Sequence, residues 1–249
     1  MSERAADALR ETTITGNFTD APLASVLVCC GATRVMCTVS VEEKVPAFRE
    51  KSGGGWLTAE YAMLPGSSPY RVRRASSQGR PDGRATEIQR LVGRSLRAAF
   101  DLDRLGPRSL WIDCDVIQAD GGTRTAAITG GYAAARIAVE RLVHDGLTDR
   151  AAILDPVAAV SVGIVGGVPR LDLDYPLDSR ADVDMNVVMT GAGRFIEVQG
   201  TGERAAFSRA ELDALLGLAE RGIQSLFEVQ RRAIERALAA WPGVKRPAA

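Results

Sequence analysis

Three predicted β-hairpins give this sequence its strongest fold signal. Each has two apolar runs joined by a short turn that contains glycine, which is the pattern of antiparallel strands. The hairpins cover residues 25–40, 158–174 and 183–199. Two more strands are expected at residues 56–61 and 110–118, and the second of these alternates between apolar and polar residues. Both halves of the chain are therefore expected to contain β-sheet.

Helical patterns follow the strands in each half. Residues 86–100 and 123–144 are predicted helices of the first half, and a capping box at Ser208 starts a long helix in the second. A chain that runs twice from hairpins into helices is expected to form an α+β fold with an internal structural duplication. The corresponding predicted domains are residues 1–145 and 152–249.

The composition is that of a soluble globular protein. Of 249 residues, 46% are hydrophobic and 25% are charged, which is typical of a folded domain and not of a disordered chain. No apolar run approaches the roughly 20 residues that cross a bilayer, and the charged N-terminus does not resemble a signal peptide. The sequence therefore predicts a cytoplasmic protein without a membrane segment.

The histidine and cysteine content narrows the available chemistry. His144 is the only histidine, and no nucleophile motif surrounds it, so a mechanism that needs two histidines is excluded. The four cysteines form no CxxC motif, and we expect them to be structural rather than zinc ligands. Carboxylates, arginines, backbone dipoles or a metal ion must therefore carry any reaction.

Positive charge is concentrated in residues 71–97, although the formal net charge of the chain is zero. This segment contains eight arginines and only two acidic residues. Its first part belongs to a predicted long loop at residues 64–83, whose arginines are Arg71, Arg73, Arg74 and Arg80. Such a loop suits contact with the phosphodiester backbone of RNA. The alternatives are a solubilising loop and a subunit contact.

Residues 120–125, with the sequence DGGTRT, form the sharpest local motif. Glycines allow a ligand to approach the backbone closely, and the first N–H groups of the following helix are free to bind an anion. Gly122, Thr123 and Arg124 are therefore a candidate phosphate site. Arg84, just before the helix at 86–100, is a candidate second cation. The alternatives are a tight turn that only caps its helix and a solvated arginine.

Acidic residues cluster at one position in the second half. Asp182 and Asp184 face the same side of a predicted strand, and Asp178 lies close by in the sequence. Adjacent carboxylates repel each other and are stabilised by a hard cation such as Mg²⁺ or by a shared proton. The alternative is a solvated, acidic strand entry. Asp113 and Asp115 also share a strand face, and we expect them to pair with arginines.

Several of these blocks closely resemble the ribonuclease PH family. The resemblance extends from about residue 4 to residue 235 and is carried by GWLTAEYAMLP, GRATEIQRLVGRSLRA, WIDCDVIQADGGTRTAAITG and DMNVVMTGAGRFIEVQGTGE. It implies a fold like the second domain of ribosomal protein S5. The first predicted domain then corresponds to the N-terminal RNase PH domain with the phosphate site, and the second to the C-terminal RNase PH domain with the acidic cluster.

The resemblance also implies roles for individual residues. The family's phosphate-binding residues match Arg84, Gly122, Thr123 and Arg124. Its aspartates for catalysis and metal binding match Asp178 and Asp184. Its loop arginines, which help to hold transfer RNA, match Arg71, Arg73, Arg74 and Arg80. Gly66 and Ala75 depart from the family pattern in the same loop, where arginine and glutamate are usual, so they affect RNA contacts rather than the phosphate site.

The activity that the resemblance implies is phosphate-dependent 3′→5′ exoribonuclease, or tRNA nucleotidyltransferase, activity. Inorganic phosphate is the co-substrate, Mg²⁺ the cofactor, and the products are a nucleoside 5′-diphosphate and a transfer-RNA precursor shortened by one nucleotide. Ribosomal RNA remains an open alternative substrate. The expected assembly is a homohexamer, a trimer of dimers. Two other functions stay open: a catalytically silent RNA-binding ring subunit and a hydrolytic, metal-dependent nuclease.

Overall fold

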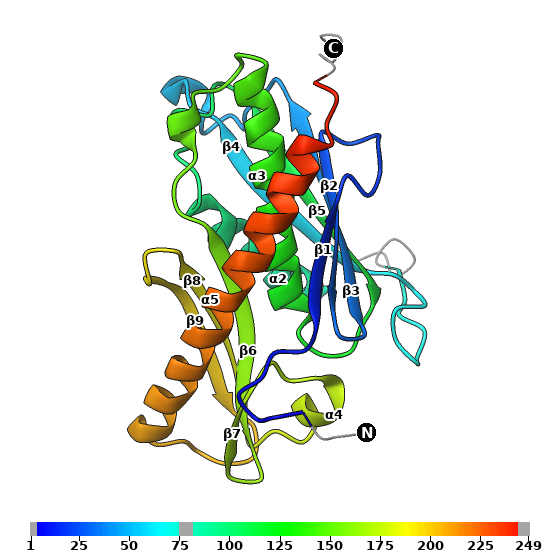
Figure 1. Ribbon diagram of the computed structural model, residues 1–249, viewed down its shortest axis with the longest axis vertical. Helices are drawn as coiled ribbons and strands as arrows, with labels where there is room; N and C mark the ends of the chain where they lie inside the picture. The colour runs from blue at the N-terminus through cyan, green and yellow to red at the C-terminus, as the bar shows by residue number, and fades with distance from the viewer. Residues whose placement is uncertain (1–3, 75–81, 244–249) are drawn as a thin grey trace.

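A five-stranded sheet forms the first half of the chain in a computed structural model that describes residues 4–74 and 82–243 (Figure 1). The strand order is β1-β2-β3-β5-β4. The strands are β1 (Thr12–Gly16), β2 (Ala24–Cys30), β3 (Thr33–Glu42), β4 (Trp56–Met63) and β5 (Ser109–Gln118). β4 and β5 are parallel, and helix α2 (Gly83–Arg97) lies between them in the chain, whereas the other neighbouring strands are antiparallel.

A four-stranded antiparallel sheet forms the second half. Its order is β7-β6-β8-β9. The strands are β6 (Val157–Val165), β7 (Val168–Leu171), β8 (Val183–Thr190) and β9 (Phe195–Gly202). The short helix α4 (Tyr175–Asp178) precedes β8, and the long helix α5 (Arg209–Ala239) runs along both sheets (Figure 1). Single 3-10 turns lie at Glu50–Ser52 and Arg150–Ala152. None of the helices in the described residues has the length and apolar character of a membrane span.

Helix α3 (Thr123–His144) is the central element of the core. It packs against β2, β3 and β5 of the first sheet and against β6 of the second. Most of its buried residues are alanine, glycine or threonine, and such small side chains allow both sheets to approach the helix closely. A second core lies between α5 and the opposite face of β6 and β8. The N-terminus of α3 is thereby fixed where the two sheets meet.

The predicted strands and helices are largely confirmed. The three hairpins are β2–β3, β6–β7 and β8–β9, and the helix predicted at 123–144 is α3. The helix predicted at 86–100 begins earlier, at Gly83, because Asp82 accepts a hydrogen bond from the Arg84 backbone N–H and caps it. β1 was not predicted, since its sequence TTITG buries only Ile14 and has no clear alternation.

The prediction that Asp113 and Asp115 pair with arginines is wrong within the described residues. They lie on the face of the first sheet that points away from α3, where Asp113 is opposite Glu60 in the β4–β5 register. Burial, with the charges of Glu60 and Asp115, raises the pKa of Asp113, and burial raises the pKa of Asp115. By contrast Cys37 and Cys114 lie in the apolar core, as their structural role requires.

A buried ion pair connects the N-terminal segment to the second sheet. The Arg10 guanidinium donates to both carboxylate oxygens of Asp172, at 3.0 and 2.6 Å, and each side chain is only 7% exposed. Arg10 also donates to the Asp120 carbonyl oxygen at 2.5 Å. One arginine therefore connects the segment before β1, the residue that follows β7 and the loop that precedes α3.

Replacing this arginine should cost substantial stability. In Arg10→Met the buried Asp172 carboxylate loses its cationic partner and keeps the hydrogen bond from the backbone N–H of residue 10, and we expect the free energy of unfolding to fall by about 3 to 5 kcal/mol. Arg104→Met, which breaks an ion pair with Asp149 in which both side chains are more than half exposed, is the control and should cost less than about 1 kcal/mol. Urea denaturation of both variants measures the difference, and equal losses would contradict the structural role of Arg10.

Candidate active site

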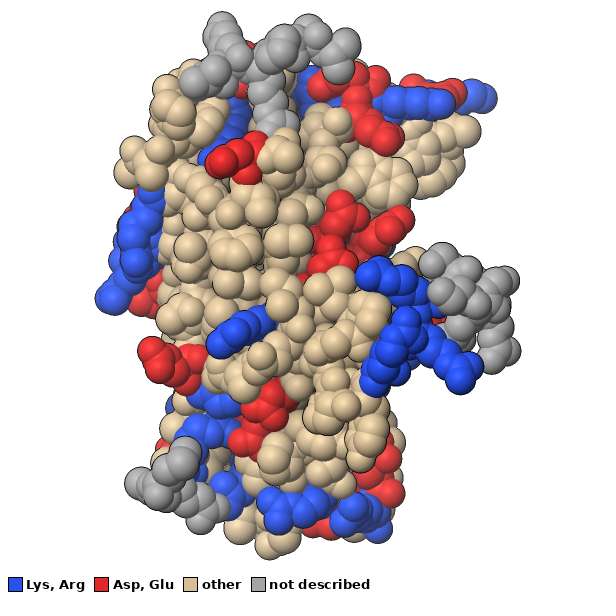
Figure 2. All heavy atoms as spheres, turned by 90° about the vertical axis from the view of Figure 1, so that its right-hand side faces the viewer, with Lys and Arg blue, Asp and Glu red and all other residues tan. Residues whose placement is uncertain are grey.

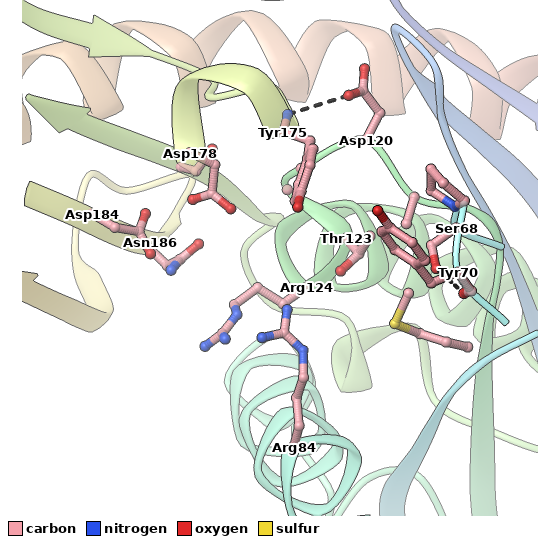
Figure 3. A pocket seen from close by; sticks show the side chains of 16 residues that line it. Ser68, Tyr70, Arg84, Asp120, Thr123, Arg124, Tyr175, Asp178, Asp184 and Asn186 are labelled. Atoms are coloured by element: carbon pink, nitrogen blue, oxygen red, sulfur yellow. Dashed lines mark hydrogen bonds between the residues drawn. The ribbon is translucent and has the colours of Figure 1, made fainter. Parts of the chain in front are cut away.

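A pocket of about 520 Å³ lies where the two sheets meet at the N-terminus of α3 (Figure 3). Residues from the N-termini of α2 and α3 line one side, and residues from α4, β6 and β8 line the other. The lining includes Arg84, Gly122, Thr123, Arg124, Asp178 and Asp184. The structure therefore brings together, in one cavity, all the residues predicted for phosphate binding and catalysis.

The loop before α3 has a backbone that only glycine readily adopts. Gly121 and Gly122 have φ angles of 71° and 65°, in the left-handed region that disfavours other residues. A Cβ on Gly121 would also lie 2.5 Å from the Leu173 carbonyl oxygen, so the loop packs directly against the chain that leads into α4. The Thr33 hydroxyl, which donates to the Gly121 carbonyl at 2.7 Å and accepts from the Asp120 N–H at 2.9 Å, holds the loop from the other side.

Thr123, the first residue of α3, is oriented by a buried tyrosine. The Tyr61 hydroxyl donates a hydrogen bond to Thr123 Oγ1 at 2.8 Å, and burial raises the pKa of Tyr61. Because Tyr61 keeps its proton, the Thr123 hydroxyl proton is free to point into the pocket. Together with the unpaired N–H groups at the start of α3, it can bind an anion.

The two arginines of the pocket are held differently. Arg124 donates to Glu87 at 3.2 Å and to Gln199 at 2.9 Å, so its guanidinium is positioned by α2 and β9 together. Arg84 projects from the N-terminus of α2, and its side chain makes no hydrogen bond or ion pair with a described residue. Figure 3 shows both side chains pointing into the same space, which gives an anion two cations and a helix N-terminus.

The two aspartates on the acidic side of the pocket have raised pKa values. Burial and the charge of Asp178 raise the pKa of Asp184 to about 6. Burial also raises the pKa of Asp178, while Arg84 and Arg124 act in the opposite direction. Asp182, the third acidic residue of the cluster, does not line the pocket; its carboxylate accepts a hydrogen bond from the Gly166 N–H.

The carboxylates of Asp178 and Asp184 fit a magnesium site. The residues described contain no group of three histidine, cysteine or acidic side chains around a metal position. Mg²⁺ commonly uses only one or two carboxylates and completes its shell with phosphate oxygens and water. Burial and the charge of Asp178 raise the pKa of Asp184, and Arg124 only partly opposes this effect; a divalent cation held by the two carboxylates would offset their repulsion.

The predicted RNA-binding arginines lie outside the pocket. Arg71, Arg73 and Arg74 are exposed and follow Tyr70, which lines the pocket. Basic side chains gather in one patch on the face drawn in Figure 2. Arg80 falls outside the described residues. A polynucleotide that enters the pocket past Tyr70 would therefore meet these arginines.

Sequence reasoning missed several residues of the site. Asn186 and Ser161 line the pocket from β8 and β6, and Tyr61 and Gln199 orient Thr123 and Arg124. The position of Asn186 follows from its strand, because residues two apart face the same side. The other three positions depend on which strands become neighbours, which the sequence alone does not show.

Two family models match this chain in consecutive segments. The first domain of the 3′ exoribonuclease family matches residues 8–153, and the second domain matches residues 155–222. The chain belongs to the 3′ exoribonuclease family.

Solved structures of distant relatives share the fold of this exoribonuclease-family chain. Rice (Oryza sativa) Rrp46 has 16% identity and a TM-score of 0.73, and the match covers 93% of this chain and 98% of that one. The Archaeoglobus fulgidus exosome with RNA bound to its active site matches at 21% identity and a TM-score of 0.74, covering 90% of each chain. An archaeal exosome core matches at 18% identity and a TM-score of 0.69, covering 92% of this chain and 89% of that one. At these identities the likeness establishes the fold alone, which is a mixed α+β fold with two sheets.

The raised pKa of Asp184 implies that the free energy of unfolding depends on pH. Because the pKa of Asp184 is about 6 in the folded protein and its ordinary value is 3.8, the folded state holds this proton more tightly than the unfolded state does. Protonated Asp184 therefore contributes to the free energy of unfolding at about pH 4, and this contribution is lost as the pH rises through about 6. The free energy of unfolding of Asp184→Asn, compared with that of wild type, should therefore rise by about 1 to 2 kcal/mol as the pH goes from about 4 to about 7.5.

Urea denaturation at the two pH values, in the presence of a chelator, measures this difference. A stability difference between Asp184→Asn and wild type that does not change with pH would contradict the assignment. Added Mg²⁺ should stabilise the wild type but not the variant, if the carboxylate is a metal ligand.

Proposed function

We propose that this chain is a phosphate-dependent 3′→5′ exoribonuclease that shortens RNA by phosphorolysis. One observation carries the proposal: two arginines from two helix N-termini and two carboxylates from the second sheet line a single pocket. The cationic side suits a free orthophosphate, and the acidic side suits the scissile end of a polynucleotide. Family membership supports the exoribonuclease class, and the chemistry of the pocket supports phosphate as the attacking group.

Binding and orientation of phosphate supply the first part of the mechanism. Arg84, Arg124, the Thr123 hydroxyl and the N–H groups of α3 hold the anion beside the last phosphodiester bond. The positive groups offset the repulsion between two anions, and fixed positions convert an encounter into an aligned attack. Phosphate oxygen forms a bond to the phosphorus of the terminal nucleotide, and the bond from that phosphorus to the preceding 3′-oxygen breaks.

The leaving 3′-oxygen is handled on the acidic side. Asp178 and Asp184 would hold Mg²⁺, which stabilises negative charge when bound. Asp184, whose pKa is about 6, is alternatively able to provide the proton that the leaving oxygen needs. The products are a nucleoside 5′-diphosphate and an RNA shortened by one nucleotide. Because the diphosphate keeps a phosphoanhydride bond, the reaction is reversible.

The 3′ end of a transfer-RNA precursor is the proposed substrate, and a homohexamer built as a trimer of dimers is the proposed assembly. Arg71, Arg73 and Arg74 lie exposed beside the pocket entrance and would contact the RNA backbone. Two other functions for this site are a silent RNA-binding ring subunit and a hydrolytic nuclease. The arginines and carboxylates of the pocket favour an active phosphorolytic enzyme over the first, and the cationic phosphate cradle favours it over the second.

Product analysis with an arginine variant tests the proposal. RNA is incubated with the protein and Mg²⁺, with or without inorganic phosphate. We expect nucleoside diphosphates only when phosphate is present, and we expect Arg124→Ala to lower kcat/KM by at least about 100-fold while RNA binding is retained. Arg90→Ala, an exposed arginine of α2 outside the pocket, is the control and should keep wild-type activity.

Each alternative gives a different result. Nucleoside monophosphates formed without phosphate would identify a hydrolytic nuclease. RNA binding without any product would identify a silent subunit, and wild-type turnover of Arg124→Ala would refute the assigned phosphate site.

A further inference from the structure

A neutral polar pair lines the pocket together with its charged groups. Asn186 on β8 and Ser161 on β6 both line the cavity and are directly opposite each other in the antiparallel register. Asn186 is two residues beyond Asp184, so both side chains face the same side of the sheet, roughly 7 Å apart along the strand. On β9 the residue opposite Asn186 is Gln199, which holds Arg124. Asn186 therefore adjoins both the acidic side and the support of the cationic side.

The Asn186 carboxamide lies at the wall of the pocket and has no hydrogen-bond partner among the described residues. Asn186 is only 7% exposed, yet its side chain makes no hydrogen bond with any residue in 4–74 or 82–243. Its amide atoms are not among the fully buried unpaired atoms of the described residues, so they remain accessible from the pocket, where a ligand can supply the hydrogen bonds. Figure 3 shows its side chain beside Asp184 at the pocket. Ser161 Oγ accepts a hydrogen bond from the Leu173 N–H at 3.0 Å, which leaves the hydroxyl proton available.

The charge distribution indicates what these two side chains would bind. Phosphate oxygens are attracted to Arg84 and Arg124 and repelled by the carboxylate of Asp184. A hydroxyl group carries no charge and both donates and accepts hydrogen bonds, as a carboxamide does. The neutral part of an RNA end that lies next to its phosphates is the ribose. Its 2′-hydroxyl is the group that distinguishes RNA from DNA.

We propose that Asn186, with Ser161 beside it, binds a ribose 2′-hydroxyl and makes the pocket select RNA ends over DNA ends. This inference rests on the proposed phosphorolytic function and adds a specificity-determining residue to it. The hydroxyl belongs either to the terminal nucleotide or to the penultimate one, whose 3′-oxygen leaves. Both are the same chemical group, and matched substrates separate them.

Three RNA oligonucleotides of one sequence provide the test: an all-ribose form, a form with a terminal 2′-deoxynucleotide, and a form with a penultimate 2′-deoxynucleotide. The kcat/KM of wild type, Asn186→Ala and Asn186→Leu is measured with each, because the leucine variant keeps the side-chain volume if the alanine variant is unstable. Thr190→Val is the control, since Thr190 lies on the same face of β8 outside the pocket.

Wild type should lose roughly 3- to 10-fold in kcat/KM with one of the two deoxy substrates, the effect of one lost hydrogen bond between neutral groups. Both Asn186 variants should lose a similar factor with all-ribose RNA and nothing further with that deoxy substrate, while the KM for phosphate stays unchanged. Thr190→Val should behave as wild type throughout.

If an Asn186 variant lost kcat/KM by the same factor with both deoxy substrates as with all-ribose RNA, the effects would be independent. That result would overturn the role of Asn186 and leave the phosphorolytic function unaffected. If wild type instead formed no diphosphate from all-ribose RNA and phosphate, the proposed function and this inference would fail together.

Discussion

The direct contact between the loop before α3 and the chain entering α4 is the constraint on which the site depends. A side chain at Gly121 would occupy the position of the Leu173 carbonyl oxygen, so the two segments can meet only through a glycine backbone. The buried Arg10–Asp172 pair reinforces this contact, because Arg10 also binds the Asp120 carbonyl. Without this close approach, the arginines of the first half and the carboxylates of the second would not share a pocket.

The pocket places two carboxylates from the second half opposite two arginines from the first. Asp178 and Asp184 repel each other and are partly removed from solvent, which raises the pKa of both. The positive charges of Arg84 and Arg124 counteract this effect at Asp178. Such a balance is typical of sites in which ligands supply the missing charges. A phosphate would compensate the arginines, and a divalent cation would compensate the carboxylates.

Much of the fold could be predicted because its signals are local. Hairpins with glycine turns and a small-residue helix at 123–144 are visible as patterns within short windows, and they match the structure closely. β1 could not be recognised, since a polar five-residue edge strand is defined by its pairing with β2. The predicted arginine partners of Asp113 and Asp115 were wrong for a related reason: the register places Glu60 next to Asp113 instead.

The residues of the candidate site also fall into those that a local motif predicts and those that only tertiary contacts reveal. Gly122, Thr123 and Arg124 form a motif in one stretch of sequence, whereas the neighbours of Asn186, which are Ser161 and Gln199, become apparent only when β6, β8 and β9 are aligned. Tyr61 reaches Thr123 from a strand that is distant in sequence. Residues that position others are therefore the least accessible to sequence reasoning, since their roles depend on tertiary contacts.

Isotope tracing tests the central claim most directly. Wild-type protein is incubated with RNA, Mg²⁺ and ¹⁸O-labelled inorganic phosphate, and the nucleotide products are analysed by mass spectrometry. If the pocket directs phosphate at the terminal phosphodiester, the label appears in the β-phosphate of the released nucleoside diphosphate. Release of unlabelled nucleoside monophosphate, with the label remaining in free phosphate, would contradict the account.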